Sequence, residues 1–233
     1  MENVQLGIHH LPLEHLQNPL VLHELIYPNM YKNYYWSDDF SPEYYIAQAK
    51  AGFIAVTDQY EDQELLLPEI QYTYALLDFK DLHISKKVKG LLSKKELTLE
   101  ITQNLEEVVS HINASHKNCW LSPSYLEMLN ATKGLDDNFN LISIGIREGN
   151  TLVSGEIGYV IGKTYTSLSG FSSRDKAYKN YGTAQLVLLS QYLQKSGFSF
   201  WNLGQPYMSY KIALGTKIYD RKEFLIKWFA HTN

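Results

Sequence analysis

The spacing of apolar and polar residues changes along the chain, from mixed helical and strand patterns before residue 140 to long strand patterns after it. Residues 141–173 contain three apolar runs separated by turns at Glu148-Gly149-Asn150 and Gly162-Lys163, a pattern typical of neighbouring antiparallel strands. Ser41-Pro42 and Ser122-Pro123 each predict a helix start, because Ser is a favourable N-cap and Pro fits the first helical position. The first of these helices is expected to end at Gly52.

Residues 179–204 are the most informative stretch. A basic, Gly-containing turn leads into an amphipathic helix that ends at Gly197, and an aromatic strand follows over 198–203. The first N–H groups of a helix lack partners within it, and the helix dipole adds positive charge there. The pattern therefore predicts an anion-binding turn, although a tight loop that binds nothing is the alternative. The predicted phosphate-turn residues are Lys179, Asn180, Gly182 and Ala184.

The remaining pattern completes the fold prediction. Residues 97–102 read as a strand, 105–114 as a helix, 210–215 as a helical turn and 222–229 as a final strand. Strands that outnumber the helices between them indicate an α+β fold with a mostly antiparallel central sheet. We expect a division into a smaller α/β domain at 1–115 and a second domain at 116–233.

Composition narrows the possible partners. The chain has 233 residues, 45% of them hydrophobic, and a net charge of −4, so nothing in the overall charge favours nucleic acid. Residues 83–95 are an exception, since they contain five lysines within ten positions. A phosphate backbone would suit this group, and a solvated helix face explains it equally well. The five residues are Lys86, Lys87, Lys89, Lys94 and Lys95.

Several functional classes are disfavoured. The single cysteine, Cys119, rules out an internal disulfide, and the first residues resemble neither a signal peptide nor a membrane span. We therefore expect a cytoplasmic protein that does not associate with membranes. The eight histidines are scattered without ligand spacing, so no metal is expected, and neither the G-x-G-x-x-G nor the G-x-S-x-G motif is present.

Several short motifs occur along the chain in the same order as in a known family. They begin with Asp39-Phe40-Ser41-Pro42 and the segment 49–53, and continue with Leu82-His83-Ile84-Ser85, which the basic residues follow. Cys119-Trp120-Leu121-Ser122, the segment 169–174 and Ala213-Leu214-Gly215 complete the series. With these motifs in order from about residue 38 to 229, the chain resembles the leucyl/phenylalanyl-tRNA–protein transferases, which act in the N-degron pathway.

The resemblance implies a GNAT-like acyltransferase fold in the C-terminal half and no cofactor besides the aminoacyl-tRNA co-substrate. It implies transfer of an amino acid from the tRNA acceptor end to the N-terminal amine of a protein or peptide. Gln205 and Asn202 would orient the amine and the ester, and Trp120 would stack on the terminal adenosine. The lysines of 86–95 would hold the acceptor stem. The residues expected around the aminoacyl and adenosine groups are Trp120, Glu156, Tyr165, Ser169, Gly170, Phe171, Leu188 and Tyr192.

The chain also departs from the family. Asn202 stands where the family has an Asp, and a family Glu is lost in Ser167-Leu168-Ser169. Glu156 and Gln185 fall where the family's amino-acid pocket is apolar, so either the pocket takes a polar or basic amino acid, or Glu156 faces solvent on a strand edge; the latter is favoured slightly. Two alternative functions stay open: an N-acyltransferase that uses a coenzyme A thioester, and a catalytically weak homologue that binds tRNA ends.

Overall fold

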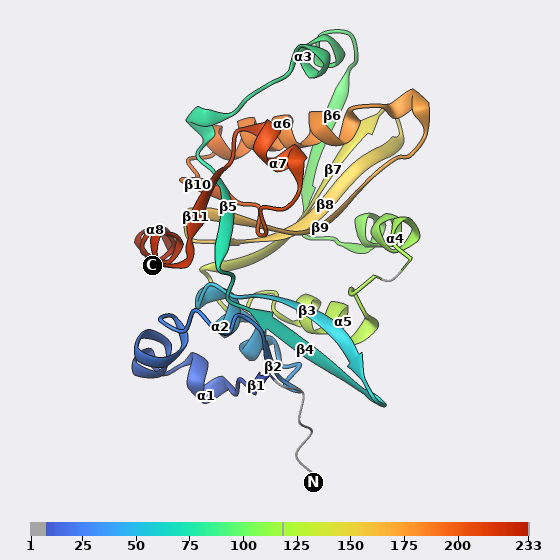
Figure 1. Ribbon diagram of the computed structural model, residues 1–233. Helices are drawn as coiled ribbons and strands as arrows, with labels where there is room; N and C mark the ends of the chain where they lie inside the picture. Colours follow the sequence, from blue (N-terminus) through green and yellow to red (C-terminus); the bar gives the residue numbers. More distant parts are fainter. Residues whose placement is uncertain (1–7, 118, 233) are drawn as a thin grey trace.

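A computed structural model describes residues 8–117 and 119–232 and is built around a seven-stranded sheet (Figure 1). The strand order is β11-β5-β10-β9-β8-β7-β6, so the first and last thirds of the chain meet at one edge. The strands are β5 (Thr73–Leu77), β6 (Leu97–Thr102), β7 (Phe139–Glu148), β8 (Thr151–Ile161), β9 (Thr164–Ser172), β10 (Phe200–Asn202) and β11 (Lys217–Asp220).

One pair of strands in this sheet is parallel. β10 runs parallel to β9, with Trp201 opposite Tyr165, whereas each of the other neighbouring pairs is antiparallel. The parallel connection contains α6 (Tyr181–Lys195), as a crossover between parallel strands requires. The β8–β9 register shifts between Ile157 and Gly158, and a Cβ on Gly158 would lie 2.3 Å from the Thr166 carbonyl oxygen. Glycine therefore allows the two strands to approach closely here.

Helices cover both faces of the sheet (Figure 1). One apolar cluster joins α6 to the sheet through residues such as Val187 and Trp201, and α3 (Lys86–Leu92) adds Val88 to it. A second cluster contains side chains of α4 (Glu106–Ser115) and α8 (Arg221–Thr232), together with Phe200 from β10. Phe200 and Trp201 thus point to opposite faces, as alternation along a strand requires. The short α7 (Ser209–Leu214) lies between β10 and β11 in the chain.

The N-terminal elements pack below the sheet as Figure 1 is drawn. The helix α2 begins at Pro42, with the Ser41 hydroxyl accepting from the Tyr44 N–H, and α5 uses Ser122 and Tyr125 in the same way. The elements of this part are β1 (His9–His10), α1 (Leu13–Leu16), the π-helical segment Val21–Ile26, β2 (Tyr35–Trp36), α2 (Pro42–Lys50), β3 (Ile54–Tyr60), β4 (Gln63–Glu69) and α5 (Pro123–Ala131). Two 3₁₀ turns, Phe79–Asp81 and Lys176–Tyr178, complete the structure.

The structure confirms the α+β class and the mostly antiparallel sheet. The final element was predicted wrongly, because residues 221–232 form a helix in place of the expected strand. Its buried residues Phe224, Leu225 and Trp228 follow helical spacing, which the aromatic content of the segment obscured. The predicted division at residues 115 and 116 does not follow the sheet, since β5 and β6 belong to the same sheet as β7–β11.

Candidate active site

A cavity of about 760 Å³ lies over β8 and β9, and its walls are α6, α7 and the residues Ser115, His116, Cys119 and Trp120. Its volume is within the usual range for a small-molecule or cofactor site. The strands form its floor because Glu156 and Ser167 project from them toward α6. The side chains on its walls include apolar residues from separate parts of the chain, namely Trp120, Leu168, Phe171, Leu186, Leu203 and Met208.

Glu156 is the central polar group of the floor. It is 5% exposed, and its Oε1 accepts from the Tyr165 hydroxyl at 2.8 Å and from Ser167 Oγ at 2.7 Å. Its Oε2 accepts from Gln185 Nε2 at 2.9 Å. Burial raises the pKa of Glu156 to about 7, although these donors and Lys211 oppose the rise.

Residues around Glu156 fix the direction of these hydrogen bonds. Ser154 Oγ lies against the Gln185 side-chain oxygen, so the Gln185 amide turns its NH₂ toward Glu156. Trp201 Nε1 donates to Ser167 Oγ at 2.8 Å, which leaves the Ser167 hydrogen for the carboxylate. Burial raises the pKa of Tyr165 well above its usual value, so its hydroxyl stays a donor. The network is therefore arranged to hold an acceptor at position 156.

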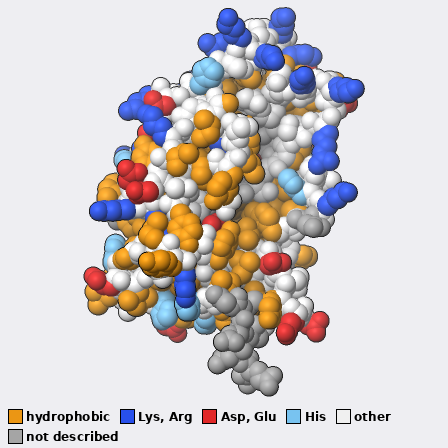
Figure 2. Space-filling view, viewed as in Figure 1, with side chains coloured by type: hydrophobic (Ala, Val, Ile, Leu, Met, Phe, Trp, Pro, Cys, Tyr) orange, Lys and Arg blue, Asp and Glu red, His pale blue; other side chains and the backbone are white. Residues whose placement is uncertain are grey.

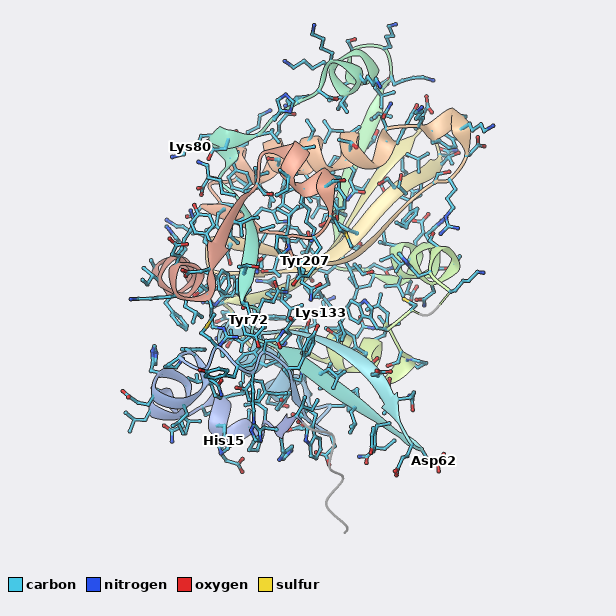
Figure 3. The ribbon with its side chains drawn as sticks, in the orientation of Figure 1. His15, Asp62, Tyr72, Lys80, Lys133 and Tyr207 are labelled. Carbon is cyan, nitrogen blue, oxygen red and sulfur yellow. The ribbon has the colours of Figure 1, made fainter. Side chains whose placement is uncertain are left out.

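Lys211 reaches the cavity from α7. Its Nζ donates to the carbonyl oxygens of Leu203, at 2.5 Å, and Gln205, at 2.7 Å, and thereby holds the segment after β10. Burial lowers the pKa of Lys211 to about 8, with Glu156 opposing the shift. Figure 3 places Tyr207, which is 80% exposed, on the segment that connects β10 to α7.

The N-terminus of α6 opens into the same cavity. Asn180 adopts the left-handed conformation, with φ of 72°, and places Gly182 and Thr183 on the cavity wall. A Cβ on Gly182 would lie 2.9 Å from Ser172 Oγ, so a larger residue would push α6 away from β9. Among the described residues, the backbone N–H groups of Gly182 and Thr183 have no hydrogen-bond partner. This helix end can therefore bind an anionic or carbonyl oxygen.

The family model that matches this chain is described as leucyl/phenylalanyl-tRNA protein transferase, and the match covers residues 76–228. This range includes the whole of the large sheet except the first three residues of β5. The chain belongs to the leucyl/phenylalanyl-tRNA–protein transferase family. A relative of the same name in Flavobacterium johnsoniae is 28% identical, over 64% of this chain and 69% of the relative. Another in Maridesulfovibrio salexigens is 27% identical, over 80% of this chain and 75% of the relative.

Solved structures with a related arrangement are more distant. FemX is 10% identical with a TM-score of 0.46, and the alignment covers 76% of this chain and 66% of FemX. A GCN5-related N-acetyltransferase from Kribbella flavida is 10% identical with a TM-score of 0.39, over 74% of this chain and 59% of that protein.

Within this family fold, about half of the predicted binding residues meet at the cavity. Trp120, half-buried, packs edge-on against Tyr125 with the ring centroids 5.0 Å apart. Glu156 is not at a solvent-facing strand edge, because β8 lies inside the sheet, and the favoured interpretation of its position was wrong. The predicted residues that line the cavity are Trp120, Glu156, Ser169, Gly170, Phe171, Asn180 and Gly182.

The structure does not bring Asn202 and Gln205 to the cavity surface. Asn202 is 1% exposed, and its Oδ1 accepts from the Gly204 N–H at 2.9 Å. Gln205 Nε2 donates to Glu69 Oε2 at 2.8 Å. Both side chains are engaged in holding the turn after β10, so direct contact with the reacting groups would require this turn to rearrange.

Other predicted residues also lie outside the cavity. Tyr165 and Ala184 are fully buried, the former behind Glu156. Leu188 packs near Ile146 and Val153, and Tyr192 is 42% exposed further along α6. Positions 188 and 192 are three and seven residues after Gln185, so they lie near the same side of α6 but about one and two turns further along the helix, beyond the cavity. Lys179 is exposed before the helix.

The basic segment forms α3 and the turn after it. Figure 2 shows Lys and Arg side chains gathered over α3. Lys95 pairs with Glu148 at 2.7 Å, whereas within residues 8–117 and 119–232 the other four lysines of this group have no ion pair. The five residues are all exposed: Lys86, Lys87, Lys89, Lys94 and Lys95.

Sequence reasoning missed Lys211 and the polar support of Glu156. Lys211 is a single lysine within the apolar helical stretch 210–215, and a lysine in such a position is a sequence signal for a buried, paired charge. The structure shows that Lys211 is buried. The roles of Ser154 and Ser167 depend on contacts between β8, β9 and α6, which no local pattern reveals. In the part of the chain that the structure describes, no group of three or more potential metal ligands occurs, and no helix is long and apolar enough to span a membrane.

Proposed function

We propose that the cavity is where this protein transfers an amino acid from a charged tRNA to the N-terminal amine of a protein. The observation that carries the proposal is the family match over residues 76–228, which contain the floor and all walls of the cavity. The amine nitrogen would attack the ester carbonyl carbon, the ester C–O bond would break, and the tRNA 3′-oxygen would take up the proton that the amine loses. No cofactor takes part in this scheme.

The cavity supports this reaction mainly by positioning. Holding an amine and an ester in attack geometry removes much of the entropic barrier. The free N–H groups at the start of α6 would hold a phosphate or the ester carbonyl oxygen, and the latter contact would stabilise the negative charge that develops during attack. Lys211 would keep the segment that contains Gln205 against the cavity wall.

The direct test measures transfer itself. The purified protein would be incubated with tRNA charged separately with each labelled amino acid and with peptides that begin with each of the standard residues. We expect labelled peptide with at least one charged tRNA, and none when a coenzyme A thioester replaces the tRNA. Transfer from the thioester alone, or from no donor, would overturn the proposal.

Trp120 should contribute to binding of the tRNA end. Its half-buried ring faces the cavity, and stacking of a base on an aromatic ring contributes about 1–3 kcal/mol. Trp120→Ala should weaken binding of an acceptor minihelix ending in CCA by roughly tenfold or more, and Trp120→Phe should retain most of the affinity. Fluorescence titration measures both. Equal binding by the Ala variant and the wild type would remove Trp120 from the tRNA site.

The α3 lysines should supply salt-dependent affinity for the acceptor stem. Reversing Lys86, Lys87 and Lys89 to Glu should weaken minihelix binding by more than tenfold at low salt and reduce the slope of log K against log salt by about 0.7–0.9 per lost contact. Lys222→Glu on α8, an exposed single charge reversal on another element, is the control for each of the three single reversals and should leave minihelix binding nearly unchanged. An unchanged slope in the triple variant would contradict this assignment.

A further inference from the structure

The floor of the cavity contains a buried carboxylate that has no cationic partner. Among the described residues no ion pair includes Glu156, and its hydrogen-bond partners are the neutral groups of Tyr165, Ser167 and Gln185. Burying a carboxylate is costly unless a cation or enough donors compensate it. The fold tolerates this cost at one position of the cavity floor, which points to a role in binding.

Glu156 has room for one more donor. A carboxylate can accept about four hydrogen bonds, and the structure supplies two to Oε1 and one to Oε2. Tyr165, Ser167 and Gln185 occupy the protein side of the group, and Glu156 itself lines the cavity. The open acceptor position therefore faces the space where a ligand would lie.

The charged groups around the cavity do not fill this position. Lys211 reaches the same cavity, but its ammonium donates to two backbone carbonyl oxygens. Arg174 Nη2 donates to the Ser115 carbonyl oxygen at 2.7 Å, and His116 lies 3.1 Å from the Gly170 carbonyl oxygen; both are exposed. Among the described residues no further hydrogen bond to Glu156 is formed, so this position is open to a donor from the ligand.

We infer, on the basis of the function proposed above, that this cavity selects an aminoacyl group whose side chain ends in a hydrogen-bond donor, with Glu156 and Gln185 as the specificity-determining residues. A hydrocarbon side chain such as that of leucine or phenylalanine would cover the carboxylate without replacing its lost hydration. An ammonium or guanidinium end would supply the missing charge, because hydrogen bonds to ionised partners are the stronger ones. Lysine and arginine therefore head the expected order of substrates.

The experiment compares transfer rates across charged tRNAs. With saturating acceptor peptide, we expect kcat/KM for tRNA charged with lysine or arginine to exceed that for leucine and phenylalanine by at least tenfold, since sites built for a polar group discriminate strongly against analogues that lack it. Preferred transfer of leucine or phenylalanine by the wild-type protein would overturn the inference while leaving the proposed function intact.

Variants connect the preference to the two residues. Glu156→Met combined with Gln185→Leu should reverse the order toward leucine and phenylalanine, and Glu156→Gln should reduce the preference for lysine and arginine at least tenfold. Glu127→Gln, exposed on α5, is the matched control. Thermal unfolding checks that the double variant folds, and Glu156→Gln serves as the test if it does not. A changed preference among acceptor peptides, with the donor order unchanged, would overturn the assignment to the aminoacyl group.

A binding measurement separates this inference from the transfer reaction. Non-hydrolysable 3′-amide analogues of lysyl- and leucyl-adenosine would be titrated into the wild-type protein and Glu156→Gln. Tighter binding of the lysyl analogue, lost in the variant, supports the inference even where no transfer is detected. Equal binding of the two analogues by the wild-type protein contradicts it.

Discussion

Replacing Arg221 with methionine should lower the free energy of unfolding by on the order of 4 kcal/mol, because it leaves a set of buried carbonyl oxygens without donors. Arg221 is the first residue of α8 and is 1% exposed. Its guanidinium donates to carbonyl oxygens in the segments 27–32 and 70–71, and its Cζ lies 5.1 Å from the centre of the Tyr72 ring, which Figure 3 labels. The acceptors belong to Tyr27, Asn29, Lys32, Ile70 and Gln71.

The contacts of Arg221 explain why the loss should be large. The side chain joins α8 to the segment after the π-helical turn and to the connection between β4 and β5, so its removal weakens three parts of the fold at once. Urea unfolding followed by circular dichroism measures the change. Arg221→Lys retains the charge but offers three donors in place of five, and it should recover less than half of the loss.

An exposed neighbour gives the control for this prediction. Lys222→Ala changes the next residue of α8, whose side chain is exposed, and should alter the unfolding free energy by less than about 0.5 kcal/mol. If Arg221→Met lowered the free energy of unfolding no more than Lys222→Ala does, the guanidinium would not be a structural link between α8 and the N-terminal region.

The helices and strands with clear local patterns were predictable from sequence. Ser41-Pro42 and Ser122-Pro123 identify the starts of α2 and α5, and the Gly-bounded segment identifies α6, because capping and backbone preferences act within a few residues. The segment 222–229 was misassigned since its aromatic and apolar residues fit a strand as well as a helix. Packing against β5 and β11 decides in favour of α8.

The candidate site was only partly predictable, for a different reason. Residues near the α6 turn and on β9 were found through local motifs and the family resemblance. The hydrogen bonds from Gln185 to Glu156, and the withdrawal of Asn202 and Gln205 into the turn after β10, depend on which side chains face each other across separate elements. A one-residue difference in strand register would reverse these faces, and the bulge at Ile157 and Gly158 introduces such a difference.

The unfolding free energy should also depend on pH through Glu156. The pKa of this group is raised from 4.5 to about 7 in the folded protein, chiefly by burial. Between these two values the folded state keeps a proton that the unfolded state has lost, so the contribution of Glu156 to stability is fully present below pH 4.5 and is lost as the pH rises through 7. A shift of this size corresponds to about 3 kcal/mol.

The difference between the wild-type protein and Glu156→Gln isolates this effect. From pH 4.5 to 7.5, the unfolding free energy of the wild type should fall by about 3 kcal/mol relative to that of the variant. Other carboxyl groups titrate in both proteins and cancel in the comparison. Urea unfolding at four pH values in this interval provides the measurement. Parallel pH curves for the two proteins would show that Glu156 is equally easy to ionise when folded and unfolded.

A ligand with a cationic end should remove much of this pH dependence. Bound over Glu156, a positive charge favours the ionised carboxylate and lowers its pKa toward the usual value. Saturating lysyl-adenosine amide should therefore stabilise the wild-type protein more at pH 7.5 than at pH 5, whereas the leucyl analogue should stabilise it less at pH 7.5 than at pH 5, because its hydrocarbon side chain would cover the ionised carboxylate. The cost of burying Glu156 would then be offset when the preferred aminoacyl group is bound. Equal stabilisation by the lysyl analogue at both pH values would show that it binds without contacting the carboxylate.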